Sequence, residues 1–278
     1  MEINKPIFII GVARSGTTIL SKLFTQHKDT AYFENYSSRY YRKPWMFRFI
    51  PMLMKYQKFR YGIDRPEPSE GWVFDRFYRH LDYLDEKQVT NEIKKYYTNA
   101  IKYQLKAFNA KRFVNKNPRS CLRIRWLNEM FPDAFYIAIW REPKSIISSM
   151  YEQLKKWENN STEFNKVHSE RDSGYGHIIE KLGKDKSQIE TCFNYYNCLK
   201  NGLDKDLEIV SDRLIKLDYE DFVKEPKESL KKLYNFVELK WYPELERKIP
   251  NKLKQDNNEK WKKLPIEERE ILEKSFPN

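Results

Sequence analysis

The sequence is poor in cysteine and lacks long apolar runs. Its three cysteines (Cys121, Cys192 and Cys198) are too few and too scattered for a disulfide framework or a CxxC metal site, which predicts a reducing compartment. No run of about 18 apolar residues occurs, so we expect no membrane-spanning segment. The first predicted strand starts near residue 6, which leaves no room for a signal peptide. Together these absences predict a cytoplasmic protein.

Charge is what the sequence has in quantity. Charged residues make up 33% of the 278 residues and hydrophobic residues 40%, which predicts one globular domain over residues 1–278. The net charge of +12 suits nucleic acid, an anionic membrane surface or a polyanionic nucleotide. Because Lys and Arg are spread over the whole chain without a basic arm, charge alone does not separate these three.

The first informative segment is Pro6-Ile-Phe-Ile-Ile-Gly-Val-Ala-Arg-Ser-Gly-Thr-Thr-Ile-Leu20. Residues 7–10 are apolar and β-branched, as in a buried strand, and residues 17–24 have apolar side chains at helical spacing. A strand, a glycine loop and a helix N-terminus in this order predict a phosphate cradle. A plain glycine turn is the alternative. Four residues that can donate hydrogen bonds favour the cradle: Arg14, Ser15, Thr17 and Thr18.

This loop differs from the ATP-binding P-loop, in which Lys and Ser/Thr follow the second glycine. Gly11 and Gly16 keep the glycine spacing, but Thr17 stands where the Lys belongs. The cation, Arg14, comes before the second glycine. The loop therefore suits a single 5′-phosphate better than a triphosphate with its metal ion.

The second informative segment runs from Phe135 to Met150. Arg141 follows a fully apolar predicted strand (residues 134–140), at the sheet edge where open α/β folds bind ligands. Ser149 comes eight residues later, about two helical turns on, so both side chains can face one pocket. Arg offers a planar fork to a phosphate and Ser adds a donor. Taken alone, the pair would be better explained by an Arg that caps the sheet edge and a Ser that packs in a helix.

Together the two segments resemble the sulfotransferases that use 3′-phosphoadenosine-5′-phosphosulfate (PAPS). Arg14-Ser-Gly-Thr-Thr18 resembles their 5′-phosphosulfate loop, in the Arg form typical of the carbohydrate and tyrosylprotein branches. Arg141-x-Pro with Ser149 resembles their 3′-phosphate motif. Two further segments match the family pattern between residue 6 and about residue 240: Lys116-Asn-Pro118 followed by Phe131-Pro-Asp-Ala134, and Tyr219-Glu-Asp-Phe-Val-x-x-Pro226 leading to Phe236.

Strands that alternate with helices predict an α/β fold, with one parallel sheet between two layers of helices. The resemblance implies the P-loop-NTPase-like sulfotransferase fold. We expect strands at residues 7–10, 31–33 (ending at Glu34), 112–114, 134–140 and 213–217. We expect helices at residues 17–24, 87–108, 120–131, from Pro143 onward, and at 186–203, 227–237 and 267–276.

Two variable segments, about 36–80 and 158–185, are predicted to bind the acceptor. The second is also a candidate lid. Residues 36–62 are rich in aromatic and basic side chains. Such a segment either touches a membrane or a lipid substrate, or packs its aromatics inward while its cations reach solvent. We therefore leave peripheral membrane contact open.

The resemblance implies transfer of the sulfuryl group of PAPS to an acceptor hydroxyl, with adenosine 3′,5′-bisphosphate as the leaving group. This reaction needs cations on the bridging oxygen and a base for the hydroxyl proton. Arg14 and Lys116 are the predicted cations, and no metal is expected. None of the four histidines (His27, His80, His168 and His177) is well placed as the base. Glu34 is the candidate base, since tyrosylprotein sulfotransferases use a carboxylate in this region; the alternative is a Glu that only orders the loop.

The predicted function is therefore a PAPS-dependent O-sulfotransferase acting on a carbohydrate or glycolipid. The predicted donor-binding residues are Arg14, Ser15, Gly16, Thr17, Thr18, Arg141 and Ser149. A small-molecule P-loop kinase is the first alternative. The missing Lys and the presence of Arg141, where a magnesium-binding carboxylate would stand, argue against it. A non-enzymatic module that binds RNA or membrane is the second, and it leaves both phosphate motifs unexplained; we expect no nucleic-acid partner.

Overall fold

A computed structural model of the chain describes residues 2–55, 68–70, 72–75, 77–78, 83–159, 186–253 and 258–277. Five strands form one sheet in the order β2-β3-β1-β4-β5, and every neighbouring pair is parallel. The strands are β1 (Ile7–Ile10), β2 (Thr30–Ala31), β3 (Arg112–Lys116), β4 (Phe135–Trp140) and β5 (Leu214–Asp218).

Both faces of the central strands are apolar because helices cover both. In β1, Ile7 and Ile9 face one hydrophobic cluster, while Phe8 and Ile10 face the other, and all four side chains are fully buried. A strand buried on both sides reads as a continuous apolar run, which is the pattern of residues 7–10.

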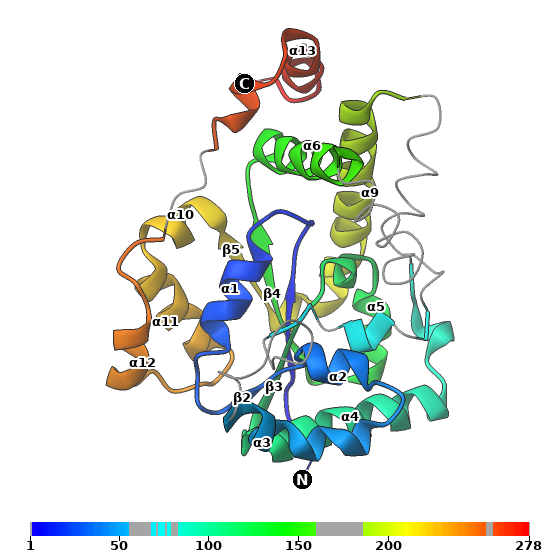
Figure 1. Cartoon of the computed structure of the whole chain (residues 1–278), viewed down its shortest axis with the longest axis vertical. Coiled ribbons are helices and arrows are strands. Elements are labelled where there is room, and N and C mark those ends of the chain that lie inside the picture. Colours follow the sequence, from blue (N-terminus) through cyan, green and yellow to red (C-terminus); the bar gives the residue numbers. More distant parts are fainter. Residues whose placement is uncertain are drawn as a thin grey trace.

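The helices divide between these two clusters. The cluster around Ile9 includes side chains from α1, α10, α11 and α12, and the cluster around Phe8 includes side chains from α4, α5, α6 and α9; in Figure 1, α1, α10, α11 and α12 lie to the left of the sheet. The α-helices are α1 (Thr17–Phe24), α2 (Asn35–Arg39), α3 (Ile50–Lys55), α4 (Asn91–Phe108), α5 (Ile124–Met130), α6 (Pro143–Asn159), α9 (Gln188–Leu207), α10 (Tyr219–Lys224), α11 (Pro226–Phe236), α12 (Pro243–Lys248) and α13 (Ile266–Ser275). Short 3-10 helices are η1 (Pro44–Phe49), η4 (Trp72–Asp75), η5 (Glu86–Gln88), η6 (Pro118–Leu122), η8 (Glu208–Arg213) and η9 (Lys260–Lys263). In the part of the chain described, no helix is long and apolar enough to cross a bilayer.

The predicted parallel α/β fold is confirmed, with several corrections at element ends. The second strand ends at Ala31, two residues before the predicted end, because Glu34 caps the helix α2. The helix predicted at 87–108 begins at Asn91, since Thr90 accepts a hydrogen bond from the Ile93 N–H as its N-cap. The helix predicted at 120–131 is split into η6 and α5 at Arg123.

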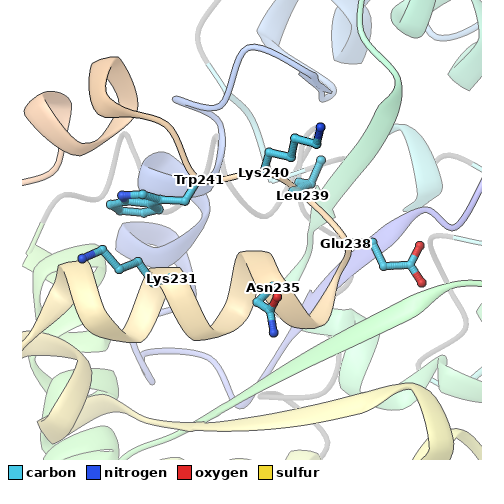
Figure 2. A pocket seen from close by; sticks show the side chains of 6 residues that line it. All are labelled: Lys231, Asn235, Glu238, Leu239, Lys240 and Trp241. Carbon is cyan, nitrogen blue, oxygen red and sulfur yellow. The ribbon is translucent and has the colours of Figure 1, made fainter.

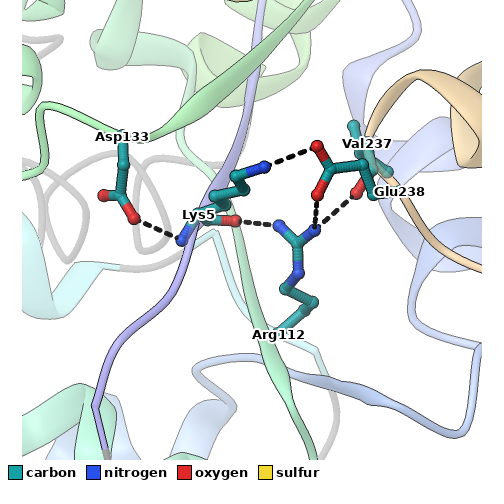
Figure 3. Close-up of polar contacts among 5 residues, drawn as sticks. All are labelled: Lys5, Arg112, Asp133, Val237 and Glu238. Atoms are coloured by element: carbon teal, nitrogen blue, oxygen red, sulfur yellow. Dashed lines mark hydrogen bonds and ion pairs between the residues drawn. The ribbon is translucent and has the colours of Figure 1, made fainter.

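A network of polar contacts fixes the amino-terminal edge of the sheet (Figure 3). Arg112, at the start of β3, donates to the Lys5 carbonyl (2.5 Å) and to the Val237 carbonyl (2.8 Å) after α11. Glu238 pairs with both Lys5 and Arg112, and Asp133 accepts from the Lys5 N–H at 2.7 Å. These contacts join β1, β3 and α11 at the edge opposite the strand ends discussed next.

Candidate donor and acceptor site

The carboxyl ends of three parallel strands bring the predicted site residues to one edge of the sheet. Gly11 follows β1, Lys116 ends β3 and Arg141 follows β4. Ile9 is in register with Lys116 and Ile10 with Ala138. This edge is where open α/β sheets bind their ligands.

The loop after β1 ends at Gly16, where the backbone conformation and the lack of space favour glycine. Gly16 has φ 97°, and a Cβ there would lie 2.4 Å from Cδ2 of Tyr219. Arg14 is also left-handed, with φ 73°. The N-cap of the following helix α1 is Gly16, which has no side chain to bond the first N–H groups, so these groups form an anion-binding end beside the loop.

The loop side chains agree with this interpretation. Ser15 is 1% exposed, and its Oγ has no hydrogen-bond partner in the part of the chain that the structure describes. A buried hydroxyl of this kind is what a bound phosphate oxygen would satisfy. Thr17 is buried in the first turn of α1, and Thr18 beside it is exposed.

Direct hydrogen bonds join the two predicted phosphate motifs. Arg14 donates from Nε to the Ser149 Oγ at 3.0 Å, across 135 residues of sequence. Arg141 donates from Nη1 to the carbonyl of Arg14 at 3.2 Å. The structure therefore brings Arg14, Arg141 and Ser149 together. We call these three residues the donor side.

Asn258, Glu220 and Tyr219, to which the sequence analysis assigned no role, lie around Arg141. Asn258 accepts from Arg141 through its Oδ1, at 3.2 Å from Nε and 3.0 Å from Nη2. Its own amide donates to Glu220 at 2.5 Å. The guanidinium carbon of Arg141 lies 4.5 Å from the centre of the Tyr219 ring, a stacked cation–π contact. Tyr219 belongs to a segment that the sequence analysis matched to the family, whereas no motif points to Asn258.

Glu34 is buried and held by hydrogen bonds. Its side chain is fully buried, accepts from the Ser37 N–H at 3.0 Å as the N-cap of α2, and accepts from Gln104 Nε2 at 3.1 Å. Burial raises the pKa of the Glu34 carboxyl from 4.5 to about 8, against the lowering effect of these hydrogen bonds. At neutral pH the carboxyl is therefore mostly protonated.

Lys116 forms an ion pair that the sequence did not indicate. Its side chain is 3% exposed, and its ammonium group donates to the carboxylate of Glu70, which belongs to the short stretch 68–70. Burial lowers the pKa of Lys116, the charge of Glu70 raises it, and the charges of Arg14 and Lys22 lower it further. The effect of Arg14 shows that Lys116 lies near the donor side. We call Glu34, Glu70 and Lys116 the acceptor side; among the described residues, no hydrogen bond or ion pair joins Glu34 to Glu70 or Lys116.

Comparison with known proteins identifies the family. A model of the Sulfotransferase family matches residues 6–243, which is most of the chain. The chain belongs to this family. It is 23% identical to omega-hydroxy-beta-dihydromenaquinone-9 sulfotransferase Stf3 of Mycobacterium tuberculosis, with 85% of this chain and 63% of the relative covered. The chain thus spans less than two thirds of the length of this curated relative.

Solved structures of sulfotransferases share the fold. Sulfotransferase STF9 of Mycobacterium avium superposes with a TM-score of 0.60 at 14% identity, over 100% of this chain and 70% of that one. The sulfotransferase domain of the curacin biosynthetic pathway gives 0.55 at 16% identity, over 99% and 98%. The predicted family and the predicted sulfotransferase fold are both confirmed.

Some site predictions fall outside what the structure describes. The candidate lid lies almost wholly in residues 160–185, and parts of the acceptor segment 36–80 are likewise outside the described residues. Within the described ranges, no group of three or more His, Cys, Asp or Glu side chains gathers as a metal site. That the reaction needs no metal stays a prediction.

A separate pocket lies near the end of α11 and contains none of the site residues (Figure 2). Its lining comes from α11 and the segment after it: Lys231, Asn235, Glu238, Leu239, Lys240 and Trp241. The Trp241 indole donates to Glu246 at 3.1 Å, and Lys231 lies 5.6 Å from the ring centre. The contacts among these side chains support packing of α11, and no chemistry is assigned to them.

Proposed function

We propose that this member of the sulfotransferase family transfers the sulfuryl group of PAPS to a hydroxyl group. The observation that carries the proposal is the direct contact between the two phosphate motifs, Arg14 with Ser149 and Arg141 with the Arg14 carbonyl. A nucleotide with phosphates at both its 5′ and 3′ positions needs two such anion sites side by side. ADP and ATP need only the first.

Each of the predicted donor-binding residues has a proposed role. The backbone N–H groups at Gly16, Thr17 and Thr18, with the Ser15 hydroxyl, would hold the 5′-phosphosulfate at the N-terminus of α1. Arg141 and Ser149 would hold the 3′-phosphate. The Asn258 oxygen now accepts from the Arg141 fork, and a phosphate oxygen would take its place.

In the transfer, the acceptor oxygen attacks sulfur in line while the bond from sulfur to the bridging oxygen breaks. The electron pair stays on that oxygen, which becomes one of the 5′-phosphate oxygens of the leaving adenosine 3′,5′-bisphosphate. Arg14 and Lys116 are the cations proposed to stabilise the developing charge. The acceptor proton passes to a carboxylate.

Two carboxyl groups on the acceptor side compete for the role of base. Glu34 is the predicted one, and its pKa of about 8 means that it would accept a proton efficiently only near or above that pH. Glu70 is the second candidate, because its carboxylate already contacts Lys116. The matched variants Glu34→Gln and Glu70→Gln separate them.

For the acceptor we propose a hydroxyl of a carbohydrate or glycolipid, the class indicated by the Arg form of the first loop. The relative Stf3 is named for a hydroxylated menaquinone, which supports including hydroxylated lipids in the search. The cytoplasmic location stays a prediction of the sequence.

The test is donor use. Purified protein is incubated with PAPS or with adenosine 5′-phosphosulfate, which lacks the 3′-phosphate, together with sugars, glycolipids and hydroxylated lipids. Release of adenosine 3′,5′-bisphosphate or AMP is measured with and without a metal chelator. We expect PAPS to be used at least about tenfold faster, since the lost contacts are charge-assisted. Equal use of both donors, or phosphoryl transfer from ATP with magnesium, would overturn the proposal.

A further inference from the structure

The segment between α2 and the end of α3 exposes an unusual set of side chains. From Arg39 to Lys55, every exposed residue is either basic or apolar. The exposed residues are Arg39, Arg42, Lys43, Trp45, Arg48, Phe49, Pro51, Met52 and Lys55. Trp45, Phe49 and Met52 are 44%, 36% and 51% exposed, which is high for such large apolar side chains. We call this set the basic–aromatic surface.

The exposed apolar side chains belong to a segment that is itself well packed against the core. The same segment buries Phe47, Ile50 and Leu53, and the Phe47 ring packs edge-on against Phe33 at 6.3 Å. η1 and α3 therefore have one apolar side anchored in the protein and a second apolar side, Trp45, Phe49 and Met52, facing outward. The sequence analysis left two alternatives for this segment, and the structure shows that aromatics point both inward and outward.

Arginine side chains of this surface make cation–π contacts with its aromatic rings. The Arg48 guanidinium lies 5.1 Å from the ring centre of Trp45 and 4.8 Å from that of Phe49. Arg42 stacks on Tyr41 at 5.5 Å and donates to its hydroxyl. An indole beside Arg side chains is the pairing typical of the boundary between lipid headgroups and acyl chains, where the ring is half apolar and the cation meets phosphate.

The charge around this surface is predominantly positive. The sequence has no Asp or Glu from residue 35 to residue 63. The neighbouring helix α4, which η1 and α3 contact, exposes Lys94, Lys95 and Lys106 against one acid, Glu92. In Figure 1, α3 lies beside α4 at the end of the molecule opposite α13.

We propose that the basic–aromatic surface docks the protein onto an anionic lipid bilayer. Trp45, Phe49 and Met52 enter the headgroup boundary, while Arg42, Lys43 and Arg48 bind lipid phosphates. A nucleic acid would match the charge but leave Phe49 and Met52 without a role. A protein partner would need an acidic surface with apolar pockets for Trp45, Phe49 and Met52, and it is an outcome of the test below.

The test uses the whole protein and needs no nucleotide, so its outcome is independent of the proposed enzymatic function. Binding is measured by sedimentation with vesicles of phosphatidylcholine alone and of phosphatidylcholine with about one third phosphatidylglycerol. We expect strong binding only to the anionic vesicles, and weaker binding at high salt. Trp45→Ala/Phe49→Ala should lower partitioning at least about tenfold. Arg42→Ala/Lys43→Ala should lower it about 30-fold, which corresponds to about 1 kcal/mol for each cation.

Matched controls come from the opposite end of the molecule. Ile266→Ala removes an exposed apolar side chain (65% exposed), and Lys262→Ala/Lys263→Ala removes two exposed cations from η9. Both controls should bind vesicles like the wild type, and all variants should keep the wild-type circular dichroism and melting temperature. Three outcomes would overturn the proposal: no binding to anionic vesicles, equal losses in the controls, or a Trp45-dependent dimer or RNA complex without vesicle binding.

Discussion

The donor side and the acceptor side hold their cations in different ways. On the donor side, Arg14 and Arg141 donate to the Ser149 hydroxyl, the Arg14 carbonyl and the Asn258 amide oxygen, all of which are neutral. On the acceptor side, Lys116 is paired with the carboxylate of Glu70.

This difference bears on what each side can bind. Neutral hydrogen-bond acceptors orient a guanidinium without cancelling its charge, so Arg14 remains attractive to an anion, and no carboxylate among the described residues pairs with it. Lys116 is buried and compensated, so its charge becomes available only if Glu70 is displaced or protonated. We therefore propose that the donor side binds a nucleotide tightly and that the acceptor side changes its protonation during the reaction.

The largest effects should come from the acceptor side and appear in turnover alone. The variant of the true base, Glu34→Gln or Glu70→Gln, should lose about 10²- to 10⁴-fold in turnover, while its affinity for adenosine 3′,5′-bisphosphate stays near that of the wild type. Lys116→Ala should also lose turnover, and Lys111→Ala is the matched control on an exposed lysine. Wild-type turnover in both glutamine variants would remove the carboxylate base from the account.

If Glu34 is the base, wild-type turnover should rise with pH up to about 8. A profile that is flat in this range, together with a slow Glu70→Gln variant, would assign the role to Glu70.

Donor-side variants should show the reverse pattern and weaken binding. Arg141→Ala should raise the dissociation constant for the bisphosphate at least tenfold, since truncating one side of a desolvated charge pair costs about 2–5 kcal/mol. Ser149→Ala should lose less, roughly 1.5–3 kcal/mol at most. Arg213→Ala is the control, because Arg213 bonds Ala134 and Asn128 at the other edge of the sheet. Unchanged affinity in Arg141→Ala would mean that the 3′-phosphate lies elsewhere.

The third prediction concerns how Glu34 makes the stability of the protein depend on pH. The pKa of Glu34 is about 8 in the folded protein against 4.5 in the unfolded chain, so the folded state holds the proton more tightly. This contribution to the free energy of unfolding is complete below pH 4.5 and is lost as pH rises to about 8. Between pH 6 and 7.5, Glu34→Gln should therefore gain about 2 kcal/mol relative to the wild type.

Denaturant titrations at the two pH values measure this difference. Glu92→Gln, an exposed glutamate on α4, is the control and should show no such gain. A constant difference between Glu34→Gln and wild type across this range would show that the carboxyl is ionised in the folded protein.

Parts of this site that follow from local sequence patterns could be predicted, whereas contacts between distant segments could not. The proximity of Arg14, Arg141 and Ser149 was predictable because each lies at a fixed position relative to the end of a buried strand, and parallel strands end at one edge. Asn258 was not, because it meets Arg141 across 117 residues and belongs to no local pattern. Glu70 lies in a proline-containing loop, where no periodicity indicates the direction of a side chain.

The strand ending at Glu34 was mispredicted for a different reason. Residues 31–33 have the β-forming side chains of a strand, but Glu34 and Ser37 exchange hydrogen bonds as a capping box and begin α2 instead. This capping box has Glu at the N-cap and Ser at N3, which reverses the usual order, so the residue pattern did not reveal it.

The smallest effect should come from the contact that occupies the donor side now. The Asn258 oxygen accepts two hydrogen bonds from Arg141, and a 3′-phosphate must displace it. Asn258→Ala should therefore bind the bisphosphate more tightly, by less than about tenfold, since a net hydrogen bond contributes about 0.5–1.5 kcal/mol. ADP affinity, measured in the same titration, should not change. Weaker bisphosphate binding in this variant would show that Asn258 is itself a phosphate ligand.

The most direct test of the central claim is a comparison of adenosine 3′,5′-bisphosphate with ADP on the wild-type protein, by calorimetric titration without magnesium. Two joined anion sites predict that the bisphosphate binds at least about tenfold more tightly. At 100 times its dissociation constant it should add about 2.7 kcal/mol to the free energy of unfolding. Equal affinity for the two nucleotides would contradict the account, because it would leave Arg141 and Ser149 without a 3′-phosphate to bind.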